Sequence, residues 1–185
     1  MSKAARFGVR IGLAWALGLA SANSSSAAAT SPEFAVKATY LHKLAAFVAW
    51  PESAFETPAS PIQFCVAGAS PFGPMLQQAV ADQRIGSHPI QVRYLERADR
   101  VSGCHVLYLA APSPAFASEG LRGAAAMPVL TGTDAAFEDH PTGIIHFVLR
   151  DARVRFMVDE AAAARNGLTL SSKLLGLALT TRSRS

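Results

Sequence analysis

Cysteine is scarce in this chain of 185 residues, which contains only Cys65 and Cys104. Two thiolates are too few for a structural zinc site, which needs four ligands. The histidines do not supply the missing ligands, because they show no metal-ligand spacing; they are His42, His88, His105, His140 and His146. The sequence therefore predicts no metal site.

Motifs of catalysis are also missing. The sequence has no nucleophile elbow, no phosphate-binding glycine-rich loop and no zinc-protease histidine pair. A catalytic Cys65 is the remaining alternative, but no adjacent residue would activate its thiol, and Phe64 and Val66 indicate burial. We expect a protein without catalytic residues and without a cofactor.

A basic stripe of the kind that binds nucleic acid is absent as well. The net charge of the whole chain is +4, and Lys3, Arg6 and Arg10 of the N-terminal segment contribute three of the 17 basic side chains. Without these three, 14 basic side chains stand against 13 acidic ones, a net charge of +1. We therefore expect no nucleic-acid partner.

Residues 1–22 have the pattern of a secretory signal peptide. A basic start is followed by the apolar run Ile11–Ala20, which is too short to span a bilayer, and by the small residues Ala20-Ser21-Ala22 at a cleavage position. A retained N-terminal anchor is the alternative. No later stretch is long and apolar enough to cross a membrane, so we expect an exported chain with its signal removed.

Export changes what the two cysteines are expected to do. In an oxidising compartment a cysteine pair is more often a disulfide than a metal or redox-catalytic site. Cys65 and Cys104 each lie in an apolar run, which favours a bond within one chain over a bond between two chains. Such a bond would join neighbouring strands of the core.

The remaining chain has the size of one domain, which we place at residues 30–180, after a disordered linker at 23–29 and before a flexible tail at 181–185. The first helix is predicted from Thr30 to about Trp50. Its expected buried face consists of Val36, Tyr40, Leu41, Leu44, Phe47 and Val48. Strands then alternate with helices, so we expect an α/β fold: a three-layer sandwich with a mixed, mainly parallel sheet and a C-terminal antiparallel hairpin.

That hairpin is predicted over Ile144–Arg150 and Arg153–Asp159. One of its faces is apolar, whereas the other is mixed and includes His146, Arg155 and Met157. These three side chains are our candidate surface for an anionic or aromatic ligand or for a partner segment. The alternative is a solvated face, or one covered by a helix.

Several stretches, taken together and in order, resemble the YfiR-like family of periplasmic proteins. The resemblance covers nearly all of the chain after the signal peptide. The matching stretches are 36–51, 64–68 with 71–73, 104–108, 143–147, 154–159 and 170–178.

The resemblance implies a non-enzymatic periplasmic regulator. The best-known relative binds the periplasmic sensor part of a membrane-bound diguanylate cyclase and holds it inactive; release raises cyclic di-GMP and favours biofilm formation. In the family, the cysteines at the positions of Cys65 and Cys104 form a disulfide, and the second pair of some relatives is absent here. Arg155 matches the family, whereas Met157 and Asp159 stand where the family usually has Glu and Asn.

We therefore expect a membrane-bound sensor as the partner, with homodimerisation left open. A protein that reversibly inhibits a sensor by binding it needs no active site, which agrees with the missing catalytic motifs. A periplasmic small-ligand binding domain of a sensing or transport system is the main alternative. An enzyme with an unfamiliar site is the third reading.

Overall fold

The computed structural model describes residues 32–134 and 142–182. The expected signal peptide, the linker and Thr30, the predicted start of the first helix, lie outside the described residues. The helices are α1 (Pro32–Ala45), the 3-10 turn η1 (Glu52–Ala54), α2 (Phe72–Ala79), α3 (Pro114–Gly123), α4 (Glu160–Arg165) and α5 (Ser172–Leu177). The strands are β1 (Val48–Ala49), β2 (Ile62–Ala67), β3 (Arg84–Ile85), β4 (His88–Leu95), β5 (Val106–Leu109), β6 (Leu130–Asp134), β7 (Ile145–Arg150), β8 (Arg153–Asp159), β9 (Thr169–Leu170) and β10 (Thr181–Arg182).

Eight strands form one mixed sheet in the order β10-β8-β7-β6-β5-β2-β4-β3. The pairs from β7 through β6, β5 and β2 to β4 are all parallel, whereas β7–β8 and β3–β4 are antiparallel. The α/β class and the mainly parallel sheet are thus confirmed. The terminal hairpin is followed at the edge of the sheet by one more strand, because β10 pairs with β8 in parallel on its outer side.

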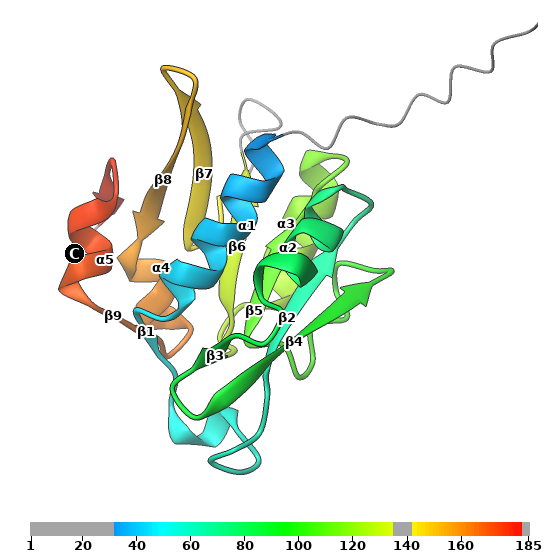
Figure 1. Ribbon diagram of the computed structural model, residues 1–185, viewed down its shortest axis with the longest axis vertical. Coiled ribbons are helices and arrows are strands. Elements are labelled where there is room, and N and C mark those ends of the chain that lie inside the picture. Colours follow the sequence, from blue (N-terminus) through cyan, green and yellow to red (C-terminus); the bar gives the residue numbers. More distant parts are fainter. Residues whose placement is uncertain (1–31, 135–141, 183–185) are drawn as a thin grey trace, which may run out of the picture.

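Helices cover both faces of this sheet and give three layers. The crossover from β2 through α2 to β4 moves toward the β3 edge of the sheet. The crossover from β5 through α3 to β6 moves toward the β10 edge. Right-handed crossovers in opposite directions place their helices on opposite faces. Accordingly, α1 and α2 lie side by side over one face, and α3 lies over the other (Figure 1).

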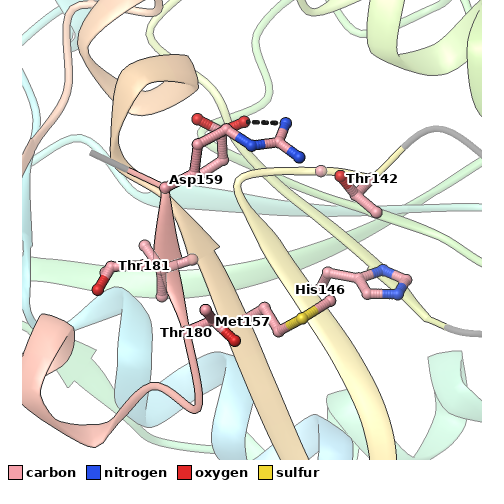
Figure 2. A pocket seen from close by; sticks show the side chains of 9 residues that line it. Thr142, His146, Met157, Asp159, Thr180 and Thr181 are labelled. Atoms are coloured by element: carbon pink, nitrogen blue, oxygen red, sulfur yellow. Dashed lines mark hydrogen bonds and ion pairs between the residues drawn. The ribbon is translucent and has the colours of Figure 1, made fainter. Parts of the chain in front are cut away.

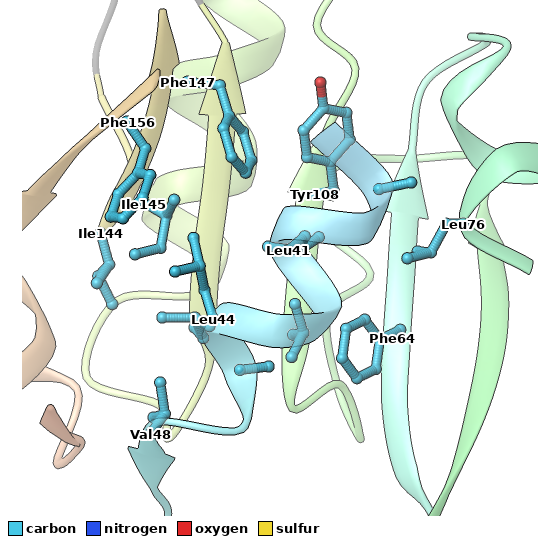
Figure 3. Close-up of a cluster of buried hydrophobic side chains, with 14 of the residues drawn as sticks. Leu41, Leu44, Val48, Phe64, Leu76, Tyr108, Ile144, Ile145, Phe147 and Phe156 are labelled. Atoms are coloured by element: carbon cyan, nitrogen blue, oxygen red, sulfur yellow. The ribbon is translucent and has the colours of Figure 1, made fainter. Parts of the chain in front are cut away.

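Each face has its own hydrophobic cluster. The larger one fills the space between the sheet and α1, and it includes Leu41, Phe64, Tyr108 and Phe147 (Figure 3). Phe72 at the start of α2 stacks on Tyr108, with ring centroids 3.6 Å apart. The smaller cluster lies under α3 and contains both cysteines.

Cys65 and Cys104 form a disulfide, as expected. Cys65 lies within β2, but Cys104 lies two residues before β5, so the bond joins a strand to the entry of its parallel neighbour. The guanidinium Nη2 of Arg93 on β4 lies 3.1 Å from the sulfur of Cys104. Both sulfur atoms are therefore enclosed on the α3 face.

The first helix is shorter than predicted. It ends at Ala45 rather than near Trp50, because a turn bond from the Phe47 amide to the Leu44 carbonyl is followed by β1. β1 pairs antiparallel with β9 in a small second sheet. The apolar residues that continue the helical pattern belong to this strand and its turn.

The buried face of α1 is also displaced from the expected one. Leu41 and Leu44 are buried as predicted, but Val36 and Tyr40 are exposed, and Lys37 is buried with 5% of its surface accessible. Lys37 forms ion pairs with Glu33 and with Asp134 on β6. Two carboxylates thus let an ammonium group occupy a position that apolar periodicity assigns to the surface.

The predicted hairpin is confirmed. Ile145, Phe147 and Leu149 of β7 pair with Val158, Phe156 and Val154 of β8. Asp159 caps α4 by accepting the Ala162 amide at 2.8 Å, and Ser171 caps α5. Thr181 and Arg182, which we assigned to a flexible tail, instead form β10, because their backbone pairs with the end of β8.

Candidate functional site

Two of the three predicted surface residues come together. His146 on β7 and Met157 on β8 are cross-strand partners. They line a pocket of about 370 Å³ at the edge of the sheet (Figure 2). The other lining residues are Thr142, Gly143, Val158, Asp159, Thr180, Thr181 and Arg182.

Two polar side chains of this pocket, His146 and Asp159, are engaged in holding the fold. His146 is buried, and its Nδ1 lies 2.9 Å from the hydroxyl of Thr133 on β6. The same hydroxyl accepts the Gly143 amide, so it fixes the entry to β7. The carboxylate of Asp159 forms an ion pair with Arg182 at 3.2 Å, and it also caps α4. The pocket offers a thioether, hydroxyls and a paired charge, which suits binding better than catalysis.

The third predicted residue, Arg155, does not belong to that pocket. It pairs with Val148 in the hairpin register and lies exposed near the outer side of β8. It lines two adjoining hollows, of about 500 and 270 Å³, and Tyr40 also lines both. We call these two adjoining hollows together the α1–hairpin groove. It is lined by Pro32, Glu33, Val36, Tyr40, Lys43, Leu44, Phe47, Leu149, Ala152, Arg153, Val154, Arg155, Phe156 and Leu177.

The groove gathers exposed apolar side chains. Six large apolar residues in the described part of the chain are exposed, and four of them line the groove: Val36, Tyr40, Leu149 and Leu177. Leu149 and Leu177 keep 54% and 62% of their surface accessible. Scattered exposed apolar residues are ordinary, but a group that shares one depression indicates an interaction surface.

A buried polar cluster at the adjacent end of α1 was not predicted. The Tyr108 hydroxyl donates to the Asp134 carboxylate at 2.6 Å, and Lys37 reaches the same carboxylate at 3.1 Å. Burial, together with the negative charge of Asp134, raises the pKa of Tyr108 well above its usual value. The phenol therefore stays protonated and acts as a fixed donor. The i,i+4 spacing of Glu33 and Lys37 was the only local signal of this cluster.

The sequence matches a known protein family. The sequence model of the YfiR/HmsC-like family matches residues 34–179, which is most of the chain. This chain belongs to the YfiR/HmsC-like family. No curated protein matches it significantly.

Membership confirms the resemblance that the sequence shows. The YfiR/HmsC-like family is regulatory rather than catalytic. Within residues 32–134 and 142–182, no three His, Cys, Asp or Glu side chains lie close enough to hold a metal ion. Over the same residues, no helix has the length and apolar character needed to cross a membrane.

The buried His105 of this YfiR/HmsC-like protein is structural. His105 accepts the Gln63 amide at Nδ1, and its Nε2 lies 2.9 Å from the Ala54 carbonyl. Phe55 stacks between His105 and His88, at 4.5 and 4.0 Å. Burial is the main reason why the pKa of His105 is lowered. The ring therefore tethers the η1 loop to the sheet in its neutral form.

Proposed function

We propose that this YfiR/HmsC-like protein is a non-enzymatic periplasmic regulator. It binds the periplasmic sensor part of a membrane-bound diguanylate cyclase and restrains that enzyme. Its release raises cyclic di-GMP and favours biofilm formation. The observation that carries the proposal is the family match over residues 34–179.

Restraint of this kind is a matter of differential affinity. A regulator holds a sensor inactive only if it binds the inactive conformation more tightly than the active one. Moving a sensor from almost fully active to almost fully inactive requires a ratio of about 10⁴ between the two affinities, or about 5.5 kcal/mol. Contact area and complementarity supply that energy, and no reacting group is required.

The signal peptide and the disulfide support the periplasmic location. Residues 1–22 carry the export pattern, and Cys65 and Cys104 form a bond that persists in oxidising compartments. The α1–hairpin groove supports a binding role, because it exposes apolar surface next to cations that form no ion pair with any residue the structure describes.

The test uses a diguanylate cyclase with a periplasmic sensor segment from the same genome. The cyclase is expressed in a host of low cyclic di-GMP, with and without the full-length chain. We expect the chain to lower cellular cyclic di-GMP several-fold. A version without residues 1–22, kept in the cytoplasm, is the matched control and leaves cyclic di-GMP unchanged. If no such cyclase of that genome responds to the exported chain, the proposal is wrong.

A small-ligand binding domain is a second candidate. The pocket of about 370 Å³ beside His146 and Met157 favours it, because it falls within the size range of small-molecule sites. Native mass spectrometry of protein purified from the periplasm, with Met157→Trp as a blocked control, tests it. A bound small molecule lost in Met157→Trp supports a ligand site, and ligand-free protein argues against it.

A further inference from the structure

We propose that the α1–hairpin groove docks an amphipathic helix of the partner, with an apolar stripe flanked by acidic side chains. The inference rests on the proposed function and names the contact surface and the chemistry of the bound segment. Three observations carry it: the apolar residues that α1 turns to the groove, the missing helix over the hairpin, and the charge of the rim.

The α1 side of the groove is a regular helix surface. Val36, Tyr40 and Lys43 follow one another at intervals of four and three residues, so they lie along one ridge of α1. The Tyr40 ring meets Phe156 of β8 edge-on, with ring centroids 6.5 Å apart. This contact lies where the two hollows adjoin, since Tyr40 lines both of them. A ridge of this spacing on one helix packs into the groove between ridges of a second helix.

On the hairpin side of the groove, none of the helices within residues 32–134 and 142–182 covers the end of the hairpin at Leu149. α1 and α2 cover the middle of the sheet, and α5 covers only one end of the β7–β8 pair (Figure 1). At the other end, Leu149 remains exposed beside Val154. A helix lying beside α1 would cover this end and continue the layer.

The rim of the groove is basic. Lys43, Arg153 and Arg155 are exposed, and among the described residues none of them forms an ion pair. The one carboxylate that lines the groove, Glu33, is paired with Lys37. A complementary helix therefore carries acidic side chains beside its apolar stripe.

Two other occupants fit the groove less well. The chain's own segment 23–31 consists of Asn, Ser, Ala and Thr, so it has neither an acidic nor a large apolar side chain to offer. A symmetric contact between two copies through this surface would bring its cations face to face, because both copies present the same patch.

The first experiment measures binding of designed peptides to the mature chain by fluorescence anisotropy. The probe is a helical peptide of about 20 residues, long enough to be helical in water, with leucine at its a and d positions and flanking glutamates. Two matched peptides replace the glutamates with lysines or place a proline at the centre. We expect the acidic helix to bind at least about tenfold more tightly than either, a difference of about 1.4 kcal/mol.

Variants of the chain locate the binding site. Arg155→Glu and Tyr40→Ser are each expected to weaken acidic-peptide binding at least about tenfold, a difference of about 1.4 kcal/mol. Arg100→Glu and Tyr94→Ser make the same changes at exposed positions outside the groove and should leave binding unchanged. Circular dichroism confirms that each variant is folded. The proposal would be overturned if the lysine peptide or the proline peptide bound as tightly as the acidic helix. It would also be overturned if Arg155→Glu had no effect on binding of the acidic helix.

The second experiment separates this proposal from the proposed function. In the cyclase assay, Arg155→Glu and Tyr40→Ser should return cyclic di-GMP to the level without the chain, whereas Arg100→Glu should not. Restraint that survives both groove variants contradicts the groove and leaves the function standing. Peptide binding with the expected variant pattern, in a chain that restrains no cyclase, supports the groove and contradicts the function. Self-association of the chain that Arg155→Glu abolishes would assign the groove to a second copy instead.

Discussion

At the scale of single residues, the burial of Lys37 depends on carboxylate partners from two elements. Its ammonium group is buried, and it is neutralised by Glu33 one turn earlier and by Asp134 on β6. Removing one member of a buried ion pair leaves the others without compensation and typically costs about 3–5 kcal/mol.

Lys37→Met should therefore lower the free energy of unfolding by about 3 kcal/mol, the lower end of that range, because Glu33 is partly exposed. Lys43→Met, on the same helix but exposed, is the matched control and should change stability by less than about 0.5 kcal/mol. Urea unfolding followed by circular dichroism measures both. Equal effects of the two substitutions would show that the ion pairs do not stabilise α1.

His105 gives the protein a pH-dependent stability. Burial lowers the pKa of His105 in the folded state from the ordinary value of 6.5. Between the lowered pKa and 6.5 the unfolded chain binds more protons, so the free energy of unfolding falls as the pH drops below about 6.5. The cause is local: a proton on Nδ1 would face the Gln63 amide that Nδ1 accepts.

The Tm of the wild type should therefore fall between pH 7 and pH 5, and His105→Gln should show a shallower slope over the same range. Part of the slope remains, because the pKa of His42 is also lowered, chiefly by burial and also by Lys43. Differential scanning calorimetry at several pH values measures the slopes. Parallel curves for the two proteins would argue against His105 as the source.

Single residues also show why sequence reasoning succeeded in one place and failed in another. Cys65 had one conceivable intramolecular partner, so the disulfide with Cys104 followed once export was recognised. The burial of Lys37 depends on Asp134, 97 residues away, and no periodic pattern encodes such a contact. Tyr40 was assigned to the core because it is apolar at helical spacing, although it faces the groove.

At the scale of elements, the hairpin turn is a place where the chain tolerates strain. Asp151 and Ala152 both have positive φ, at 50° and 56°. That backbone suits a two-residue hairpin turn, in which Asn-Gly and Asp-Gly are preferred. Alanine in the left-handed region costs about 1–2 kcal/mol, because its Cβ crowds the carbonyl oxygen.

Ala152→Gly should raise the free energy of unfolding by about 0.5–1 kcal/mol, because the relief of that crowding exceeds the extra entropy of the unfolded chain. The same substitution in the exposed helix interior, Ala35→Gly, should lower it by about 1 kcal/mol. Chemical denaturation compares the two. Destabilisation of similar size in both would mean that the turn is not strained.

Local signals defined the elements that the sequence predicted correctly. Asp159 and Ser171 cap their helices with their own side chains, and hairpin alternation set the register of β7 and β8. The two-residue strands β1, β9 and β10 form only through pairing with distant segments, so no local pattern marks them. The early end of α1 follows from one of these pairings.

At the scale of the whole molecule, the three residues of the predicted surface line different hollows. The reason is that a long side chain near the edge of a sheet can reach around to the other face. The alternation of side chains along the two strands predicts that His146, Arg155 and Met157 share one face. His146 and Met157 do line one pocket. β10 pairs only with the last two residues of β8, so among the described strands none lies outside Arg155. Its long side chain thus lines the groove on the α1 side.

The disulfide and the groove belong to opposite faces of the sheet, so loss of the bond should affect stability and binding differently. The bond closes a loop with a sequence separation of 39, which corresponds to about 4 kcal/mol if it acts by restricting the unfolded chain. The double variant Cys65→Ala with Cys104→Ala should lose about that much stability in urea unfolding. Its m-value should rise, because an unrestricted unfolded chain exposes more surface.

Acidic-helix binding by this double variant should stay within about twofold of the wild type under conditions where the variant is folded. The groove is built from α1, β7, β8 and α5, whereas the cysteines lie in the cluster under α3. Arg155→Glu is the complementary control, since this exposed side chain should matter for binding and contribute little to the free energy of unfolding. A folded double variant without peptide binding would mean that the disulfide shapes the groove across the sheet, and oxidation state would then control partner binding directly.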